Sequence, residues 1–224
     1  MLHFWTWNNY QIAWQVKEQK KDTEIATVLI HGFGASKEHW RFNEKAISKL
    51  TTCYAIDLIG FGDSSQPNAQ LLYGKKKPEN FYYCFDNWSK LIIDFCDEIV
   101  QKPVILIGNS IGGVIALNAS KGLEKRCSRI ILIDCAQRTM DDKRLPEQSL
   151  FMRFLRPVIK TLVRQKFLSQ TLFKNAANPN FIKNILNVAY PSGQNLDEDL
   201  IKILFTPTQR NGAPEAFRGF INLF

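Results

Sequence analysis

A serine flanked by glycines carries the strongest chemical signal in the sequence. The segment Gly108-Asn109-Ser110-Ile111-Gly112 follows an apolar run and precedes a stretch of helical character. A serine on a sharp strand-to-helix turn adopts a strained backbone, and only glycine fits two residues before and two after it. The turn would lift the Ser110 hydroxyl to a helix N-terminus, where developing negative charge is favoured. We therefore predict that Ser110 is a nucleophile; the alternative is a glycine-rich turn with an inert serine.

A second glycine-rich segment, His31-Gly32-Phe33-Gly34, ends another apolar run. Glycines at this place would leave backbone N–H groups unblocked near the nucleophile. We expect the N–H of Phe33 to join the N–H of Ile111 as an oxyanion hole, because such donors stabilise the charge that develops in the transition state. His31 is expected to be structural, hydrogen-bonded to the loop backbone, and not a proton carrier.

Two acidic residues follow predicted strands. Asp57 opens the segment DLIGFGDS at 57–64 and is expected to bind loop N–H groups, a structural role. Asp134 ends the fourth buried strand, where it is a candidate for the catalytic acid; its alternative role is a turn or helix cap. The five cysteines are scattered, with no CxxC and no Cys/His pairing at metal spacing. We therefore expect reduced thiols, no metal and no other cofactor.

The elements that must position these residues alternate along the chain. Short apolar runs predict buried parallel strands, and helical spacing predicts the helices between them. This alternation predicts an α/β fold with a mostly parallel sheet and helices on both faces. Residues 145–205 are helical in period and lack a buried strand, so we expect a core part at 1–137 and a helical cap insert at 138–224. The expected strands are 10–16, 26–31, 53–57, 103–109 and 129–134, and the expected helices are 38–50, 86–100 (with Asp86 as N-cap) and 111–124.

Three motifs together resemble the α/β-hydrolase superfamily: HGFGAS at 31–36, DLIGFGDS at 57–64 and GNSIGG at 108–113. Within it, FWTW near the start, SKEHW at 36–40 and the segment 197–217 are similar to a plant and cyanobacterial branch. That branch includes pheophytinase-like and chlorophyll-dephytylase-like proteins. The resemblance implies the α/β-hydrolase fold and a hydrophobic ester substrate, for example the phytyl ester of a chlorophyll derivative.

The resemblance also places the acid and the histidine base of a serine hydrolase after the nucleophile in the chain. The three histidines, His3, His31 and His39, all precede Ser110. We therefore expect the C-terminal strands, with the base and the acid, to lie beyond residue 224. This chain alone is then expected to be inactive or weakly active, since removing triad members lowers activity by several orders of magnitude.

The net charge of +8 is unevenly distributed, because no Asp or Glu occurs from Gln148 to Leu196. Residues 150–168 form a basic amphipathic stretch, and one interpretation is a lid over Ser110 that touches an anionic membrane surface. The alternative is a cap helix packed on the core with a solvated basic face. The sequence contains no nucleic-acid-binding motif, export signal or apolar run long enough to span a membrane. We expect a cytoplasmic protein, and the lid would allow peripheral membrane contact.

These features together predict a serine hydrolase that cleaves a carboxylic ester through an acyl-enzyme on Ser110. The substrate is expected to be a small hydrophobic ester. A serine nucleophile argues against dehalogenase and epoxide-hydrolase chemistry, which members of this superfamily perform with an aspartate at that position. The alternative is a non-catalytic binding module that keeps the hydrolase pocket and has no complete triad.

Overall fold

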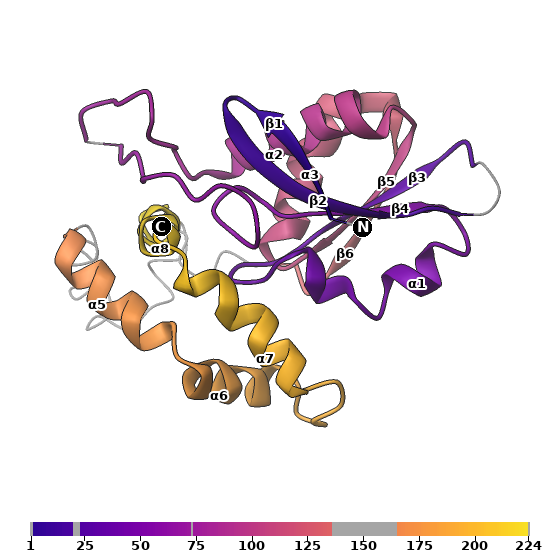
Figure 1. Cartoon of the computed structure of the whole chain (residues 1–224). Coiled ribbons are helices and arrows are strands. Elements are labelled where there is room, and N and C mark those ends of the chain that lie inside the picture. The colour runs from indigo at the N-terminus through magenta and orange to yellow at the C-terminus, as the bar shows by residue number, and fades with distance from the viewer. Residues whose placement is uncertain (1, 20–22, 73, 136–164, 224) are drawn as a thin grey trace, which may run out of the picture.

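A six-stranded sheet is the framework of the computed structural model, which describes residues 2–19, 23–72, 74–135 and 165–223 (Figure 1). The strands pair in the order β1-β2-β4-β3-β5-β6. Strands β4, β3, β5 and β6 are parallel, whereas β1 and β2 are added antiparallel at one edge. The predicted α/β class and mostly parallel sheet are confirmed. The strands are β1 (Leu2–Trp7), β2 (Tyr10–Lys17), β3 (Ala26–Ile30), β4 (Thr52–Ile56), β5 (Val104–Asn109) and β6 (Cys127–Ile133).

Different helices cover the two faces of the sheet. Side chains alternate along a strand, so Val28 and Ile30 of β3 point to one face and Leu29 to the other. On the first face they share a buried cluster with helices α2 and α3, and on the second face Leu29 packs with Trp40. Every residue of β3 is buried, as expected of a parallel strand covered on both sides. The covering elements are α2 (Phe85–Phe95), α3 (Ile111–Leu123), the 3-10 turn η1 (Lys37–Trp40) and α1 (Glu44–Ile47).

Two helix predictions need correction. The single helix expected over 38–50 is replaced by η1 and α1, separated by a turn. Helix α2 begins one residue before Asp86, and its N-cap is Cys84, whose sulfur accepts the N–H of Asn87 at 3.5 Å. Cys84 has the extended backbone that a cap requires, whereas Asp86 already lies in the first helical turn. At this position its negative charge still interacts favourably with the helix dipole, but Asp86 is not the N-cap.

The strand β1 was not predicted. It forms a hairpin with β2 through Asn8 and Asn9, which have φ angles of 47° and 66°. Positive φ at both central residues is the geometry of a two-residue hairpin turn, and asparagine tolerates it better than most residues. Two tryptophans anchor the hairpin on the helical layer: Trp5 donates to Glu98 at 2.9 Å and Trp7 donates to Asp94 at 2.8 Å.

The remaining helices gather on one side of the sheet, drawn orange to yellow in Figure 1. They lie over the carboxyl ends of the parallel strands, because they line one cavity together with residues that follow β3, β4, β5 and β6. Only 165–168 of the predicted basic stretch 150–168 belong to the described residues, and the predicted boundary at 137/138 lies outside them. No described helix has the length and apolar character to cross a membrane. The helices are α5 (Lys166–Ala176), α6 (Pro179–Ala189), α7 (Glu198–Phe205), η5 (Thr206–Gln209) and α8 (Ala213–Ile221).

Polar contacts join these helices to the core. Arg41, which follows η1, donates to both carboxylate oxygens of Asp197 at 3.0 and 3.2 Å. Asp197 is also the N-cap of α7 and accepts the N–H of Leu200 at 2.7 Å. The capping bond and the Arg41 guanidinium lower the pKa of this carboxyl group, so it stays ionised. A single side chain therefore starts α7 and holds it against the core.

Candidate active site

Ser110 occupies the turn between β5 and α3 with φ 53° and ψ −119°. This backbone conformation is strained for a residue with a side chain, and it persists only where the surroundings enforce it. A Cβ atom on Gly108 would lie 2.2 Å from the carbonyl oxygen of Gly112, and one on Gly112 would lie 2.4 Å from that of Ile30. Only glycine fits at these two positions. The N–H of Ser110 donates to Ile133 at 3.0 Å, which fixes the turn to β6.

The loop that follows β3 borders the serine. A Cβ atom on Gly32 would lie 3.1 Å from the Cβ of Ser110, so the loop backbone packs directly against it. Within the described chain, the N–H groups of Phe33 and Ile111 donate to no protein acceptor. Ile111 is the first residue of α3, where N–H groups are unsatisfied by the helix itself. The two N–H groups are thus available to an oxyanion, and their catalytic role stays a prediction.

His31 is buried beneath this loop and is bound by backbone on both ring nitrogens. Nδ1 lies 2.7 Å from the carbonyl oxygen of Gly32, and Nε2 lies 3.0 Å from the N–H of Leu58. An imidazole that donates from Nδ1 and accepts at Nε2 is neutral. Burial lowers the pKa of His31 to about 4, with Lys37 adding to the shift. The ring therefore ties the loop after β3 to the loop after β4.

A buried ion pair braces the same two loops. Asp57 accepts the N–H of Lys37 at 2.5 Å and that of Asp63 at 2.8 Å, as the sequence analysis expected of a residue that binds loop N–H groups. The ammonium of Lys37, a residue that was not predicted to belong to the site, lies 3.0 Å from Asp57 and 2.7 Å from Asp63. Although burial opposes the charge, these carboxylates raise the pKa of Lys37 above its ordinary value. The network fixes the backbone of the loop after β3, which contains Phe33.

Asp134 follows β6 directly and lines the same cavity as Ser110. Its backbone has a φ of 44°, and its side chain is exposed. The candidate acid and the candidate nucleophile therefore face one space from neighbouring strands. Which of its two expected roles Asp134 performs, acid or cap, stays a prediction.

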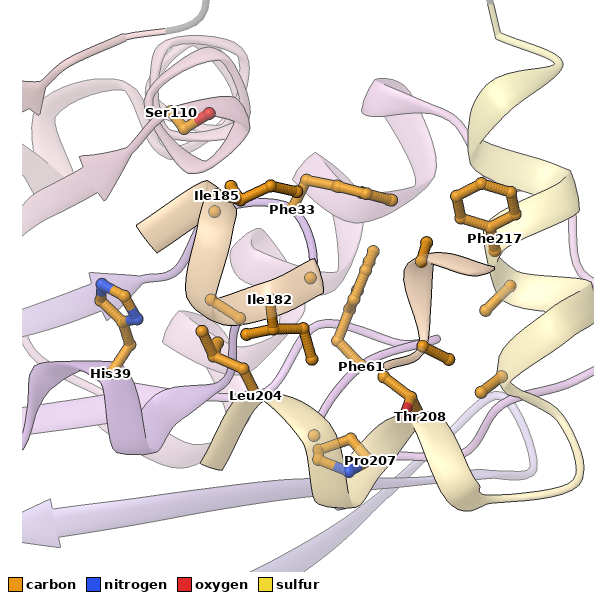
Figure 2. Close-up of a pocket in the computed structure, with 18 of the residues that line it drawn as sticks. Phe33, His39, Phe61, Ser110, Ile182, Ile185, Leu204, Pro207, Thr208 and Phe217 are labelled. Atoms are coloured by element: carbon orange, nitrogen blue, oxygen red, sulfur yellow. The ribbon is translucent and has the colours of Figure 1, made fainter. Parts of the chain in front are cut away.

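A cavity of about 600 Å³ lies between the core loops and the helices α5 to α8 (Figure 2). Ser110 is at one end, and apolar side chains such as Phe61, Ile182 and Phe217 form most of the wall. Phe33 reaches the cavity too, and its ring stacks on Phe220 of α8 with the ring centroids 4.0 Å apart. A wall of this kind accepts an apolar substrate group and gives few hydrogen bonds.

Comparison with known proteins decides the family. Residues 27–214 match the alpha/beta hydrolase family. The chain belongs to this family. The match runs from β3 to the start of α8, and so it includes the serine turn, the loops around it and the helices that close the cavity.

Several members of the family are similar to this chain. A mouse (lyso)-N-acylphosphatidylethanolamine lipase is 32% identical over 52% of this chain and 31% of its own length. A pig 1-acylglycerol-3-phosphate O-acyltransferase, ABHD5, is 32% identical over 57% of this chain and 34% of its own length. The Bacillus subtilis hydrolase YugF, which is uncharacterized, is 26% identical over 87% of this chain and 62% of its own length. The chain thus spans about a third of the two mammalian relatives.

Solved hydrolase structures share the fold at low sequence identity. An epoxide hydrolase, CorEH, has a TM-score of 0.76 at 16% identity and covers 99% of this chain and 72% of its own. A meta-cleavage product hydrolase from Pseudomonas fluorescens has a TM-score of 0.67 at 19% identity, over 96% of this chain and 66% of its own. These identities support a common fold and say nothing of a common substrate.

Within this hydrolase fold, one polar pair on the cavity wall was not predicted. Nε2 of His39, at the end of η1, lies 3.2 Å from the hydroxyl of Tyr190, which follows α6. Burial lowers the pKa of His39, with His31 and Arg41 adding to the shift. The SKEHW segment contains this histidine, but no sequence pattern indicates a partner 151 residues away. The pair joins η1 to the segment that follows α6, across the cavity.

Proposed function

We propose that this chain supplies the nucleophile and the oxyanion hole of a serine hydrolase that cleaves a hydrophobic carboxylic ester. The observation that carries the proposal is a strained Ser110 at the end of an apolar cavity, next to two N–H groups that no described protein atom accepts. A strained backbone at a residue other than glycine is costly, so the position of Ser110 beside a cavity favours a functional role.

The proposed reaction has two steps. The Oγ of Ser110 attacks the ester carbonyl, its proton passes to a base, and the N–H groups of Phe33 and Ile111 stabilise the oxyanion. The carbon–oxygen bond of the alcohol then breaks, and the alcohol leaves with that proton. In the second step, water hydrolyses the acyl-enzyme and releases the carboxylic acid product. Asp134 is one candidate for the catalytic carboxylate; the alternative is a carboxylate beyond residue 224, where the base is also expected.

The substrate class follows from the cavity and from the relatives. The wall is mostly apolar, and two mammalian relatives are named for acyl chemistry on phospholipids and acylglycerol phosphates. We propose a lipid-like ester, with the core at 1–137 and the cap at 138–224 enclosing its apolar part. The resemblance to pheophytinase-like proteins adds phytyl esters as candidates. Transfer of the acyl group to an alcohol uses the same first step, and product analysis distinguishes it from hydrolysis.

A fluorophosphonate probe tests the nucleophile in the complete protein, because the probe reacts only with an activated serine. We expect labelling of the wild type and loss of labelling in Ser110→Ala. Ser120→Ala is the matched control, since Ser120 lies on the same helix and its hydroxyl donates to Leu117. Equal labelling of wild type and Ser110→Ala would show that the nucleophile lies elsewhere.

The same experiment separates the enzyme from the non-catalytic alternative. That alternative is favoured by the position of His31, since both of its ring nitrogens are bound by backbone and neither is available to Ser110. A binding module would leave Ser110 unlabelled while a long-chain ester still bound and raised the melting temperature. An enzyme would be labelled and would turn over that ester, with a loss of several orders of magnitude in Ser110→Ala.

A further inference from the structure

A hydrogen-bonded pair on the cavity wall, His39 and Tyr190, lies apart from the serine. Both side chains line the cavity that contains Ser110, and Nε2 of His39 is 3.2 Å from the hydroxyl of Tyr190. Figure 2 shows the ring of His39 on a different part of the wall from Ser110. Mostly apolar cavities orient their ligands through a few polar groups of this kind. What this pair offers a ligand depends on where its protons lie.

The position of the His39 proton follows from the burial of the second ring nitrogen. Burial lowers the pKa of His39, so the ring is neutral and carries one proton. Nδ1 is buried and has no hydrogen-bond partner among the described residues. A buried N–H without an acceptor is rarer in proteins than a buried acceptor without a donor. The proton therefore belongs on Nε2, which donates it to the oxygen of Tyr190.

This arrangement leaves the phenolic proton of Tyr190 unused. A phenol has one proton to donate, and within the described chain its oxygen has no hydrogen-bond partner other than His39. Accepting a hydrogen bond from His39 also polarises the O–H group and makes it a better donor. Thr208, on the same wall, differs in this respect, because its hydroxyl donates to the carbonyl oxygen of Phe205 at 2.6 Å. Tyr190 therefore supplies a free donor to a mostly apolar cavity.

We propose that Tyr190 donates a hydrogen bond to a second, uncharged oxygen of the substrate, and that His39 is the positioning residue that keeps the phenolic proton free for it. This inference rests on the proposed function and narrows its substrate class to a hydrophobic ester with a further carbonyl or ether oxygen. The oxygen is uncharged because the His39 ring is neutral and the neighbouring Arg41 is paired with Asp197 at 3.0 Å. An ester with a plain hydrocarbon chain leaves the donor unpaired and is bound less well.

Esters of p-nitrophenol test the proposal in the complete protein. The substrates are the decanoate and keto-decanoates whose ketone stands at successive carbons of the chain. In the wild type, we expect one keto position to lower KM about tenfold relative to the decanoate, which is the effect of one buried hydrogen bond. Tyr190→Phe removes the donor and keeps the ring, so it should abolish this preference. His39→Phe should reduce the preference less than Tyr190→Phe does, because it leaves the phenol in place.

Thr208→Val is the matched control, since it removes a hydroxyl from the same wall whose proton is already donated within the protein. It should keep the keto preference. Nitrogen NMR of labelled histidine should show a protonated Nε2 and an unprotonated Nδ1 in His39. The assignment is overturned if Tyr190→Phe keeps the preference, if Thr208→Val loses it equally, or if the proton of His39 is on Nδ1, because Tyr190 would then donate to the ring.

The same esters separate this proposal from the proposed nucleophile. Ser110→Ala should bind them without cleaving them, so the rise in melting temperature measures binding alone. A larger rise with the preferred keto ester, lost when Tyr190→Phe is added to Ser110→Ala, would support the role of Tyr190 even if the wild type hydrolysed no ester. Equal rises with and without the ketone would overturn it, whatever the hydrolysis shows.

Discussion

The backbone at Ser110 is held in place by residues that do no chemistry. Gly108 and Gly112 leave room for the turn, and the carbonyl oxygens of Ile30 and Gly112 fill the space that a side chain would need. The serine is strained because its neighbours are packed, and the packing is set by β3 and β5 lying side by side. A glycine pattern in a sequence therefore reports on a contact between strands as much as on the serine itself.

The strained turn positions the hydroxyl of Ser110, and a buried ion pair positions the loop after β3. Lys37 and Asp57 are almost completely inaccessible to solvent, with exposures of 1% and 0%. A buried ion pair contributes little net stability, but removing one partner leaves an unpaired buried charge that is costly. The pair therefore acts mainly to fix one conformation of the loops after β3 and β4. This is the conformation in which the N–H of Phe33 is unoccupied.

The buried imidazole of His31 predicts that the free energy of unfolding decreases in acid. Its pKa is about 4 in the folded protein and about 6.5 in an unfolded chain. As the pH falls from 6.5 to 4, the unfolded state gains a proton that the folded state refuses, so unfolding becomes easier. A difference of this size corresponds to about 3 kcal/mol at the acid end, since one pKa unit is about 1.4 kcal/mol.

Histidine NMR titration measures this directly, with the resonance assigned by its loss in His31→Asn. The His31 ring should remain neutral at pH 5.5 and titrate with a midpoint near 4. A midpoint near 6.5 would mean that the ring is not held between Gly32 and Leu58, and that the loop geometry is wrong. The global acid unfolding curve is a weaker test, because Asp197 and Glu215 have lowered pKa values in the folded protein and so also destabilise it as the pH falls.

At the scale of elements, the sequence predicts strands and helices where burial is uniform. Three of the parallel strands, β3, β4 and β5, are largely buried, so their apolar runs stand out without knowledge of their partners. The strand β1 is half exposed and alternates, and the signal for it is the pair Asn8-Asn9 between two alternating segments. The hairpin therefore has a signature in the sequence, although β1 itself lacks the continuous apolar run of a buried strand.

Long-range pairing limits what the sequence can predict of the site. Ser110, Gly32 and Asp134 are predictable as neighbours, because residues at the carboxyl ends of parallel strands meet at one edge. The burial of Lys37 and the pairing of His39 with Tyr190 depend on segments that only the tertiary fold brings together. A lysine between polar neighbours gives no local sign that it will be enclosed. The candidate catalytic residues therefore have clearer signals in the sequence than the residues that hold the loops around them.

Arg210 is expected to hold the helices α7 and α8 on the core. Arg210, at the end of η5, donates to the carbonyl oxygens of Gly62 at 2.7 Å and Ser64 at 2.9 Å. Arg210→Ala removes both charge-assisted hydrogen bonds between the segment after η5 and the loop after β4. We expect hydrogen exchange in α7 and α8 to become about tenfold faster, with little change in the sheet.

Arg126→Ala is the matched control for this variant. Arg126 donates to the carbonyl oxygen of Cys96 at 2.9 Å and pairs with Asp97, so both of its contacts lie within the core. Arg126→Ala should leave hydrogen exchange in α7 and α8 unchanged. If Arg210→Ala and Arg126→Ala have the same exchange profile in α7 and α8, the hydrogen bonds of Arg210 do not contribute to holding these helices on the core.

At the scale of the whole molecule, the sheet has two edges of different character. The β1 edge belongs to a hairpin that is anchored by Trp7 on Asp94 of α2 and by Trp5 on Glu98, which follows α2. On the other edge, β6 pairs with β5 on one side and with no described strand on the other. Ile131, Leu132 and Ile133 of β6 are each 41% to 45% exposed. An apolar strand with free backbone groups is a template for pairing with another chain.

The last prediction concerns this edge in the polypeptide of residues 1–224. We expect it to self-associate with rising concentration, and Ile131→Lys to reduce the association, because a charge on an edge strand opposes strand addition. Leu50→Lys is the control, since it adds the same charge at an exposed apolar residue outside the sheet. Sedimentation velocity over a range of concentrations measures the effect. If both variants reduce association equally, the added charge acts on the whole molecule through its net repulsion. If neither does, β6 is not the contact. Only a specific effect of Ile131→Lys would show that the open edge, and not the charge of the protein, determines its state of assembly.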